Sequence, residues 1–224
     1  MKHNSPVIMF DLDGTLFDTA QAIATAFNAT FASKQLPEKD NQDICDTIGL
    51  PLEKAFSHLL NQPENTPIVM ECVTEYQRQF REAILPAAKQ LLFPGVFNGL
   101  SHLKNHQFKL AVTTNKFSRS ANALLTAAGI ADFFDIVVCA DEVEEKKPAP
   151  ESGQKILDHF QASKEQALMV GDTTHDIFMA NNLGCKAIAV NYGIHSETEL
   201  NKANPTWMAE DFRRVVDICD QHFN

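Results

Sequence analysis

The first two strand-like segments of this chain are separated by about 98 residues, and this gap constrains the fold most. The segments are short apolar runs, rich in β-branched residues, and none alternates between polar and apolar positions. That composition is typical of strands buried on both faces. Five such runs are predicted, at residues 7–10, 110–113, 136–139, 167–170 and 187–190.

Helical patterns separate the later four runs. They cover residues 118–128, 151–160 and 176–183, and the first and third end at Gly129 and Gly184, residues that commonly terminate helices. Alternating strands and helices predict a parallel sheet with helices on both faces. We therefore expect an α/β fold, a doubly wound, Rossmann-like parallel sheet.

The long gap after the first strand predicts an insertion, because a crossover needs only a dozen or so residues plus its helix. Apolar residues recur at helical spacing in three places within it, at residues 23–31, 52–60 and 69–80. We expect residues 17–87 to form a small all-helical domain. Residues 1–16 and 88–224 would form the core domain, with residues 96–103 as its first crossover helix.

Charge and cysteine content narrow the function classes. The 224 residues include 29 acidic and 19 basic ones, giving a net charge of −10, so neither nucleic acid nor an anionic membrane is an expected partner. Five widely spaced cysteines without a CxxC pair suggest reduced thiols and a cytoplasmic protein. The apolar run before Asp11 is too short for a signal peptide, and no segment approaches the ~20 apolar residues of a membrane span.

Polar side chains follow the predicted strands at the edge where open parallel sheets bind ligands. Several carboxylates converging there would repel one another and need a hard cation, and a few oxygen ligands suit Mg²⁺. A carboxylate beside Mg²⁺, with a lysine and a hydroxyl nearby, is typical of phosphoryl transfer. The candidates are Asp11 and Asp13 after the first strand, Thr114 and Asn115 after the second, Lys147 past the third, and Asp172 and Asp176 after the fourth.

These segments together resemble a known superfamily. In chain order, DLDGTLFDT, TTN, KKPAP and GDTTHD are similar to the four motifs of the haloacid dehalogenase-like phosphatases. The helical insertion matches that superfamily's cap domain, placed after the first motif. TNK at 114–116, FPGV at 93–96 and GLP at 49–51 resemble phosphoglycolate phosphatase and its near relatives. The resemblance covers nearly the whole chain.

The resemblance implies a division of catalytic roles. Asp11 would be the nucleophile that attacks phosphorus and becomes an aspartyl-phosphate. Asp13 would protonate the leaving oxygen and then deprotonate the hydrolytic water. Thr114 and Asn115 would bind the substrate's phosphoryl group, and Lys147 would bind it while balancing the charge of the nucleophile.

The resemblance also implies a Mg²⁺ site formed by Asp11, the carbonyl of Asp13, Asp172 and Asp176. For Asp176, a role as N-cap of the following helix is an equally open interpretation. Lys116, next to the second motif, could face the substrate, but a surface position is slightly favoured.

The predicted function is Mg²⁺-dependent hydrolysis of a small phosphorylated metabolite such as 2-phosphoglycolate, by a monomer or homodimer. The helix predicted to begin near Pro51 could bind the far anionic end of such a substrate. Another branch of the superfamily stays open as an alternative: a sugar-phosphate phosphatase or mutase, a nucleotidase or a pyrophosphatase. A non-catalytic, phospho-accepting signalling protein is a further alternative, but receiver domains are much shorter and lack such an insertion.

Overall fold

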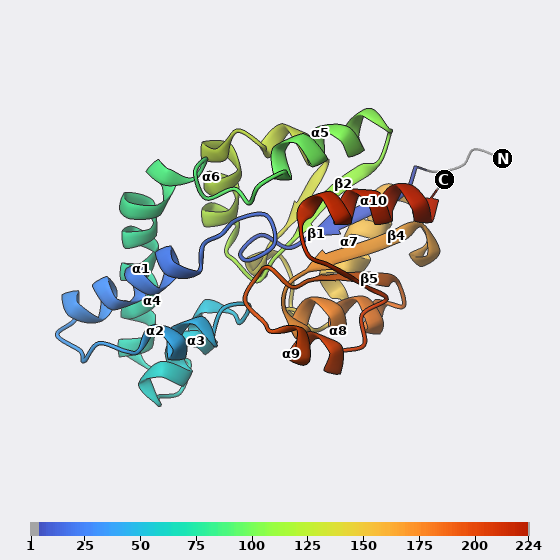
Figure 1. Ribbon diagram of the computed structural model, residues 1–224. Coiled ribbons are helices and arrows are strands. Elements are labelled where there is room, and N and C mark those ends of the chain that lie inside the picture. The colour runs from blue at the N-terminus through green and yellow to red at the C-terminus, as the bar shows by residue number, and fades with distance from the viewer. Residues whose placement is uncertain (1–4, 224) are drawn as a thin grey trace.

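The computed structural model describes residues 5–223, and its centre is a six-stranded parallel sheet (Figure 1). The strand order is β3-β2-β1-β4-β5-β6, so the chain reverses its winding direction between β1 and β4. The α/β prediction is therefore confirmed, and five of the strands are those expected from the sequence. The strands are β1 (Val7–Phe10), β2 (Lys109–Thr113), β3 (Ile136–Val138), β4 (Ala167–Gly171), β5 (Lys186–Val190) and β6 (Trp207–Ala209).

Strand β1 shows why these runs lack alternation. All four of its residues are buried, because Ile8 and Phe10 pack on one face of the sheet while Val7 and Met9 pack on the other. Helices cover both faces (Figure 1). The Phe10 face carries α5 (Val96–Asn105), α6 (Ser118–Ala128) and α10 (Phe212–Phe223), and the Met9 face carries α7 (Glu151–Phe160), α8 (Thr174–Leu183) and α9 (Glu197–Lys202).

The sequence did not predict the sixth strand, β6, at the edge of the sheet. Strand β6 has three residues and, within the described part of the chain, pairs with β5 alone. Trp207 and Met208 are partly exposed, so β6 lacks the continuous apolar run of the inner strands. Short 3₁₀ turns at Ala131–Phe133, Ala140–Glu142 and Lys164–Gln166 complete the connections.

The residues between β1 and β2 form the expected helical insertion. It contains α1 (Ala20–Ser33), α2 (Asn41–Cys45), α3 (Leu52–Leu60) and α4 (Pro67–Gln79), followed by a π-helical turn at Phe80–Ile84 and a 3₁₀ turn at Leu85–Ala87. The predicted apolar stripes meet in an aromatic core. The Phe27 ring lies 4.5 Å from that of Phe56 and 4.7 Å from that of Tyr76, measured between ring centroids. Such aromatic packing gives the insertion a core of its own.

Two paired segments connect the insertion to the rest of the chain. The backbone N–H of Asp18 donates to Leu91 O at 2.7 Å, and that of Phe93 donates to Leu16 O at 3.0 Å. An antiparallel bridge joins Phe17 to Leu92 between them. The segment that enters the insertion, at residues 16–18, therefore runs side by side with the segment that leaves it, at residues 91–93. The domain boundaries at residues 17 and 87 stay predictions. Within residues 5–223, no helix combines the length and apolar character needed to span a membrane.

Candidate active site

Two strand ends at the reversal point of the sheet carry the acidic residues. Asp11 follows β1 and Asp172 follows β4, the two neighbouring central strands. Gly14 permits the turn after β1, because its φ is +84° and a Cβ there would lie 2.0 Å from Asp172 Oδ2. The loop after β1 can therefore pass directly against the Asp172 carboxylate, which places the two motifs in contact.

Three buried carboxylates and one lysine form the centre of the site. Asp11, Asp172 and Asp176 each offer an oxygen within 4.8 Å of the others. Lys147 Nζ donates to Asp11 Oδ1 at 2.7 Å, to Asp176 Oδ1 at 2.6 Å and to the Thr113 carbonyl at 2.9 Å. All four side chains are buried. One lysine leaves two of the three negative charges without a compensating charge within this cluster.

The pKa values of the cluster are shifted in the direction expected for buried carboxylates with an excess of negative charge. Burial raises the pKa of Asp11 to about 7, and the neighbouring Asp176 adds to the rise while Lys147 opposes it. Burial also raises the pKa of Asp172 well above its ordinary value, with Asp176 and Asp11 contributing. Burial disfavours the charged form of Lys147, but its two carboxylate partners raise its pKa overall. The donor set of oxygens with excess negative charge fits a hard divalent cation.

Hydrogen bonds orient Asp172 and Asp176, from residues distant in the chain for Asp172 and from the nearby Thr173 for Asp176. Asp172 accepts from Thr15 Oγ1 at 2.7 Å and from the Ile194 N–H at 2.8 Å. Asp176 accepts from both the N–H and the hydroxyl of Thr173 through its Oδ2 atom. Thr173 is the N-cap of α8, so Asp176 is the third residue of a capping box and not the N-cap itself. The N-cap interpretation of Asp176 was therefore wrong. Its other oxygen, Oδ1, accepts from Lys147 Nζ, and its role as a metal ligand stays a prediction.

Asp13 lies beside the cluster and has partners of its own. Its Oδ1 accepts from Thr19 Oγ1 at 2.8 Å, and its Oδ2 pairs with Lys116 Nζ at 2.8 Å. Lys116 also lies over the Phe80 ring, 4.4 Å from its centroid. The slight preference for a surface position of Lys116 was wrong, since its side chain is only 10% exposed. The expectation failed because the partner of this lysine is 103 positions away in the chain.

Thr114 and Asn115 follow β2 as predicted, but they make different contacts. The Thr114 hydroxyl lines the cavity beside Asp11 and accepts from the Lys116 N–H at 3.1 Å. The Asn115 side chain donates to Gly49 O and Lys147 O and accepts from the Lys147 N–H. Asn115 thus fixes the backbone of Lys147 and contacts the insertion. Its role in binding a substrate stays a prediction.

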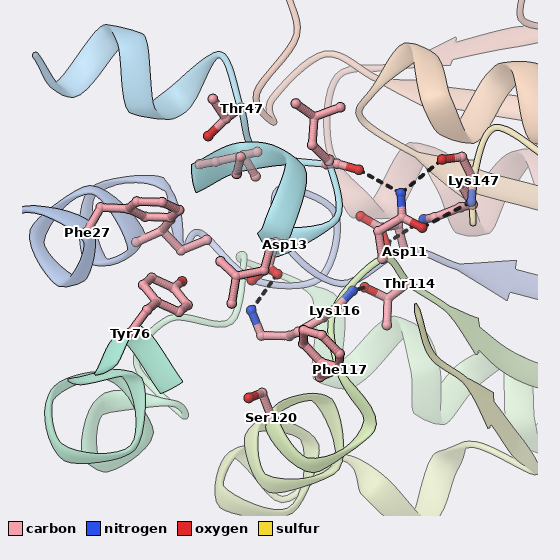
Figure 2. A pocket seen from close by; sticks show the side chains of 17 residues that line it. Asp11, Asp13, Phe27, Thr47, Tyr76, Thr114, Lys116, Phe117, Ser120 and Lys147 are labelled. Carbon is pink, nitrogen blue, oxygen red and sulfur yellow. Dashed lines mark hydrogen bonds and ion pairs between the residues drawn. The ribbon is translucent and has the colours of Figure 1, made fainter. Parts of the chain in front are cut away.

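A cavity opens between these residues and the insertion (Figure 2). Figure 2 shows Phe27 and Tyr76 of the insertion facing Asp13 and Lys116 across it, with Asp11 and Lys147 at its inner end. The space among these side chains is about 650 Å³ when the solvent at its open mouth is included, so the cavity itself is smaller.

Comparison with known proteins agrees with this geometry. Residues 8–190 match the family described as haloacid dehalogenase-like hydrolase. The chain belongs to this family. "Probable phosphatase IndB" of Dickeya dadantii is 45% identical over 211 residues, covering 94% of this chain and 92% of that protein. "Pyrophosphatase PpaX" of Halalkalibacterium halodurans is 31% identical, covering 94% and 95% respectively.

Solved structures share the fold of this family member. The predicted phosphoglycolate phosphatase from Haemophilus somnus superposes with a TM-score of 0.86 at 24% identity, covering 98% of this chain and 100% of its own. A haloacid dehalogenase-like hydrolase from Streptococcus pneumoniae gives 0.82 at 27% identity, covering 96% and 99%. The superfamily expected from the four motifs is thereby confirmed. A buried group of three aspartates is typical of the metal site in this family.

Proposed function

We propose that this hydrolase cleaves phosphomonoesters with Mg²⁺ and passes through a phosphorylated Asp11. The observation that carries the proposal is the buried group of Asp11, Asp172 and Asp176 with Lys147, at the inner end of the cavity. A nucleophilic carboxylate has to be held close to a phosphoryl group without repelling it. The lysine already reduces the charge of Asp11, and a divalent cation would reduce it further.

The metal would be held by Asp11, Asp172, Asp176 and the carbonyl of Asp13. When bound, it supplies charge neutralisation for the carboxylates and the phosphoryl oxygens. In this proposal the remaining work belongs to the chain's own groups. Lys147 and the Thr114 hydroxyl orient the phosphoryl oxygens, and Asn115 holds the Lys147 backbone in place.

Two steps then account for hydrolysis. In the first, an Asp11 oxygen bonds to phosphorus while the bond to the leaving alcohol oxygen breaks, and Asp13 gives that oxygen its proton. In the second, water attacks phosphorus, Asp13 takes a proton from that water, and inorganic phosphate leaves Asp11. The position of Asp13, which lines the same cavity as Asp11, supports this role in both transfers.

Three kinds of substrate are candidates, each suggested by a different observation. The resemblance to phosphoglycolate phosphatases suggests 2-phosphoglycolate, and the relative named pyrophosphatase PpaX suggests inorganic pyrophosphate. The open cavity beside Asp11 leaves other small phosphorylated metabolites as a third candidate. A panel of phosphometabolites with Mg²⁺ separates them by release of inorganic phosphate. The predicted absence of nucleic-acid and membrane partners, the cytoplasmic location and the monomer or homodimer state stay part of this proposal.

Trapping the intermediate tests the mechanism directly. We expect brief incubation with an activated ester, followed by acid quenching, to leave phosphate on the peptide containing Asp11, detectable by mass spectrometry. The matched control is Asp11→Asn, which should carry none. Phosphate found on a histidine, or full turnover with metal removal confirmed, would refute the mechanism.

A further inference from the structure

The wall that the insertion contributes to the cavity carries no charge. Nine residues of the insertion line the cavity, and among these described residues none is acidic or basic. We call the apolar part of this lining the insertion wall. It comprises Ile23, Phe27, Ile48, Leu50, Leu52, Ala55 and Tyr76.

The hydroxyls on this side carry no positive charge that could balance an anion. Thr47 lines the cavity, but its hydroxyl donates to the Ile44 carbonyl at 2.7 Å. Tyr76 is a member of the aromatic core, with its ring 4.7 Å from that of Phe27. Burial raises the pKa of Tyr76 well above its ordinary value, and the nearby Asp13 adds to this effect. Tyr76 is therefore neutral: its hydroxyl can donate one hydrogen bond, while its ring presents apolar surface.

The cations on the opposite side of the cavity already have partners. Lys147 pairs with Asp11 and Asp176, and Lys116 pairs with Asp13. A second anionic group on the substrate would therefore lie against apolar side chains, or would have to take Lys116 away from Asp13. Placing an unpaired charge against apolar surface is strongly unfavourable.

The electrostatic surroundings also disfavour a second anion. Residues 17–87 contain ten acidic residues against five basic ones, and Glu53 occupies the first turn of α3. Glu53 Oε2 lies 3.5 Å from Lys146 Nζ, so this pair adds no net positive charge at the start of α3. An uncharged group meets none of these penalties and gains from burial of its apolar surface.

We propose that the substrate is a phosphomonoester whose alcohol part is uncharged and apolar, with a ring or short hydrocarbon chain packed on the insertion wall. This inference rests on the proposed phosphatase function and specifies its substrate class. The phosphoryl group lies at Asp11 and Lys147, and the apolar part extends toward Phe27 and Leu52. Substrates with a second anion, such as 2-phosphoglycolate and pyrophosphate, are disfavoured by the same wall.

A matched pair of esters tests the proposal. Benzyl phosphate and 4-carboxybenzyl phosphate share the phosphoryl group and the benzylic leaving oxygen, and differ in one remote carboxylate. We expect kcat/KM for benzyl phosphate to exceed that for the carboxylated ester by at least about tenfold, since the carboxylate finds no cation on the wall. Ethyl phosphate and 2-phosphoglycolate form a second pair, for which we expect the same order.

A cation placed on the wall should reverse this preference. Leu52→Lys brings an ammonium group to the lining, so the ratio of the two kcat/KM values should shift by at least about tenfold toward the carboxylated ester. His58→Lys, on the exposed side of the same helix, is the charge-matched control and should leave the ratio unchanged. Leu50→Lys, in the loop before α3, serves as the second variant if Leu52→Lys does not fold.

The outcomes separate the two proposals. Equal or better hydrolysis of the carboxylated ester by the unmodified protein overturns the apolar substrate class, while the phosphatase function stands. A ratio unmoved by both folded lysine variants also overturns it. If neither ester nor 4-nitrophenyl phosphate is hydrolysed and no phosphate is trapped on Asp11, the phosphatase function itself fails, and the substrate class falls with it.

Discussion

The two sides of the cavity are held by different interactions: buried ion pairs on the side of the sheet, and apolar packing on the side of the insertion. On the sheet side, Lys147 donates to two buried carboxylates at 2.6 and 2.7 Å. Of these, Asp11 follows β1 and Asp176 lies in the first turn of α8. On the side of the insertion, Leu52 and Phe27 contribute apolar surface from packed helices. The sheet side thus fixes charges in place, whereas the insertion side fixes a shape and a polarity.

This contrast tells where substitutions should be costly. Removing one member of a buried, paired group leaves its partners with uncompensated charge, and the chemistry depends on those charges. Exchanging one apolar or neutral side chain for another of similar size changes contact area but no charge balance. We therefore expect steep losses of activity on the sheet side and graded changes of selectivity on the insertion side.

The largest effect should come from Asp11→Asn. An amide does not attack phosphorus, so we expect turnover to fall by about 10⁴- to 10⁶-fold, the order of loss seen when an enzyme nucleophile is removed. Steady-state release of inorganic phosphate measures it. The fold should survive, because Asn keeps the size of the side chain and can still accept from Lys147 Nζ. A variant with near-normal rates would mean that the nucleophile lies elsewhere.

Metal removal should act on the same side of the cavity, with an effect on both activity and stability. We expect chelation to abolish turnover and Mg²⁺ to restore it. Burial raises the pKa of Asp11 to about 7 from its ordinary value of 3.8 when no metal is bound. Because the folded state then binds protons more tightly than the unfolded state, stability should decrease as the pH rises from about 4 to 7.

Mg²⁺ should counteract this loss by stabilising the ionised carboxylates. The gain in Tm on adding Mg²⁺ should therefore be larger at pH 8 than at pH 5, as measured by thermal unfolding. Asp135→Asn is a suitable control, because Asp135 pairs with Lys104 on the surface at 2.7 Å and should leave the Mg²⁺ effect intact. An equal gain in Tm at both pH values would contradict the assigned cation site.

A smaller effect is expected from Lys116→Met, at the boundary between the two sides. Asp13 would keep Thr19 as a partner but lose the ammonium group that orients its Oδ2. We expect kcat to fall by about 10- to 100-fold, less than the 10²- to 10⁴-fold typical of losing a general acid or base outright, as in Asp13→Asn. Lys202→Met, an exposed lysine on α9, is the matched control. An unchanged kcat would show that the Lys116–Asp13 pair is dispensable.

The sequence predicted the sheet side of this contrast well. Strands β1 to β5 are continuous apolar runs, and parallel strands bring their carboxyl ends to one edge, so Asp11 and Asp172 could be placed together without a structure. It could not show the partners that orient them. The Ile194 N–H that binds Asp172 is a backbone donor, and the side chain at position 194 carries no trace of that role.

The sequence predicted the helices of the insertion, but it could not predict which of their residues line the cavity. The i, i+4 spacing of Ile23, Phe27 and Phe31 predicted α1 and its apolar face. Ile23 and Phe27 also line the cavity, whereas Phe31 does not, and this difference depends on how the insertion sits on the core. The periodicity of apolar residues identifies the buried face of a helix. It does not distinguish a face that packs on other protein residues from a face that lines a ligand cavity.

The smallest effect should come from Tyr76→Phe, which changes one hydroxyl on the insertion wall. If this wall acts through shape and apolar surface, kcat/KM for benzyl phosphate should change by less than about threefold, because the aromatic ring and its contact with Phe27 are retained. Burial keeps the phenol neutral, so the pH profile of kcat/KM should also be unchanged. Steady-state kinetics from pH 5 to pH 9 measure both quantities. A larger loss, or an altered pH profile, would mean that the Tyr76 hydroxyl contacts the substrate or Asp13 during turnover. The insertion would then contribute to the chemistry, and the division between the two sides of the cavity would be less sharp than the resting structure suggests.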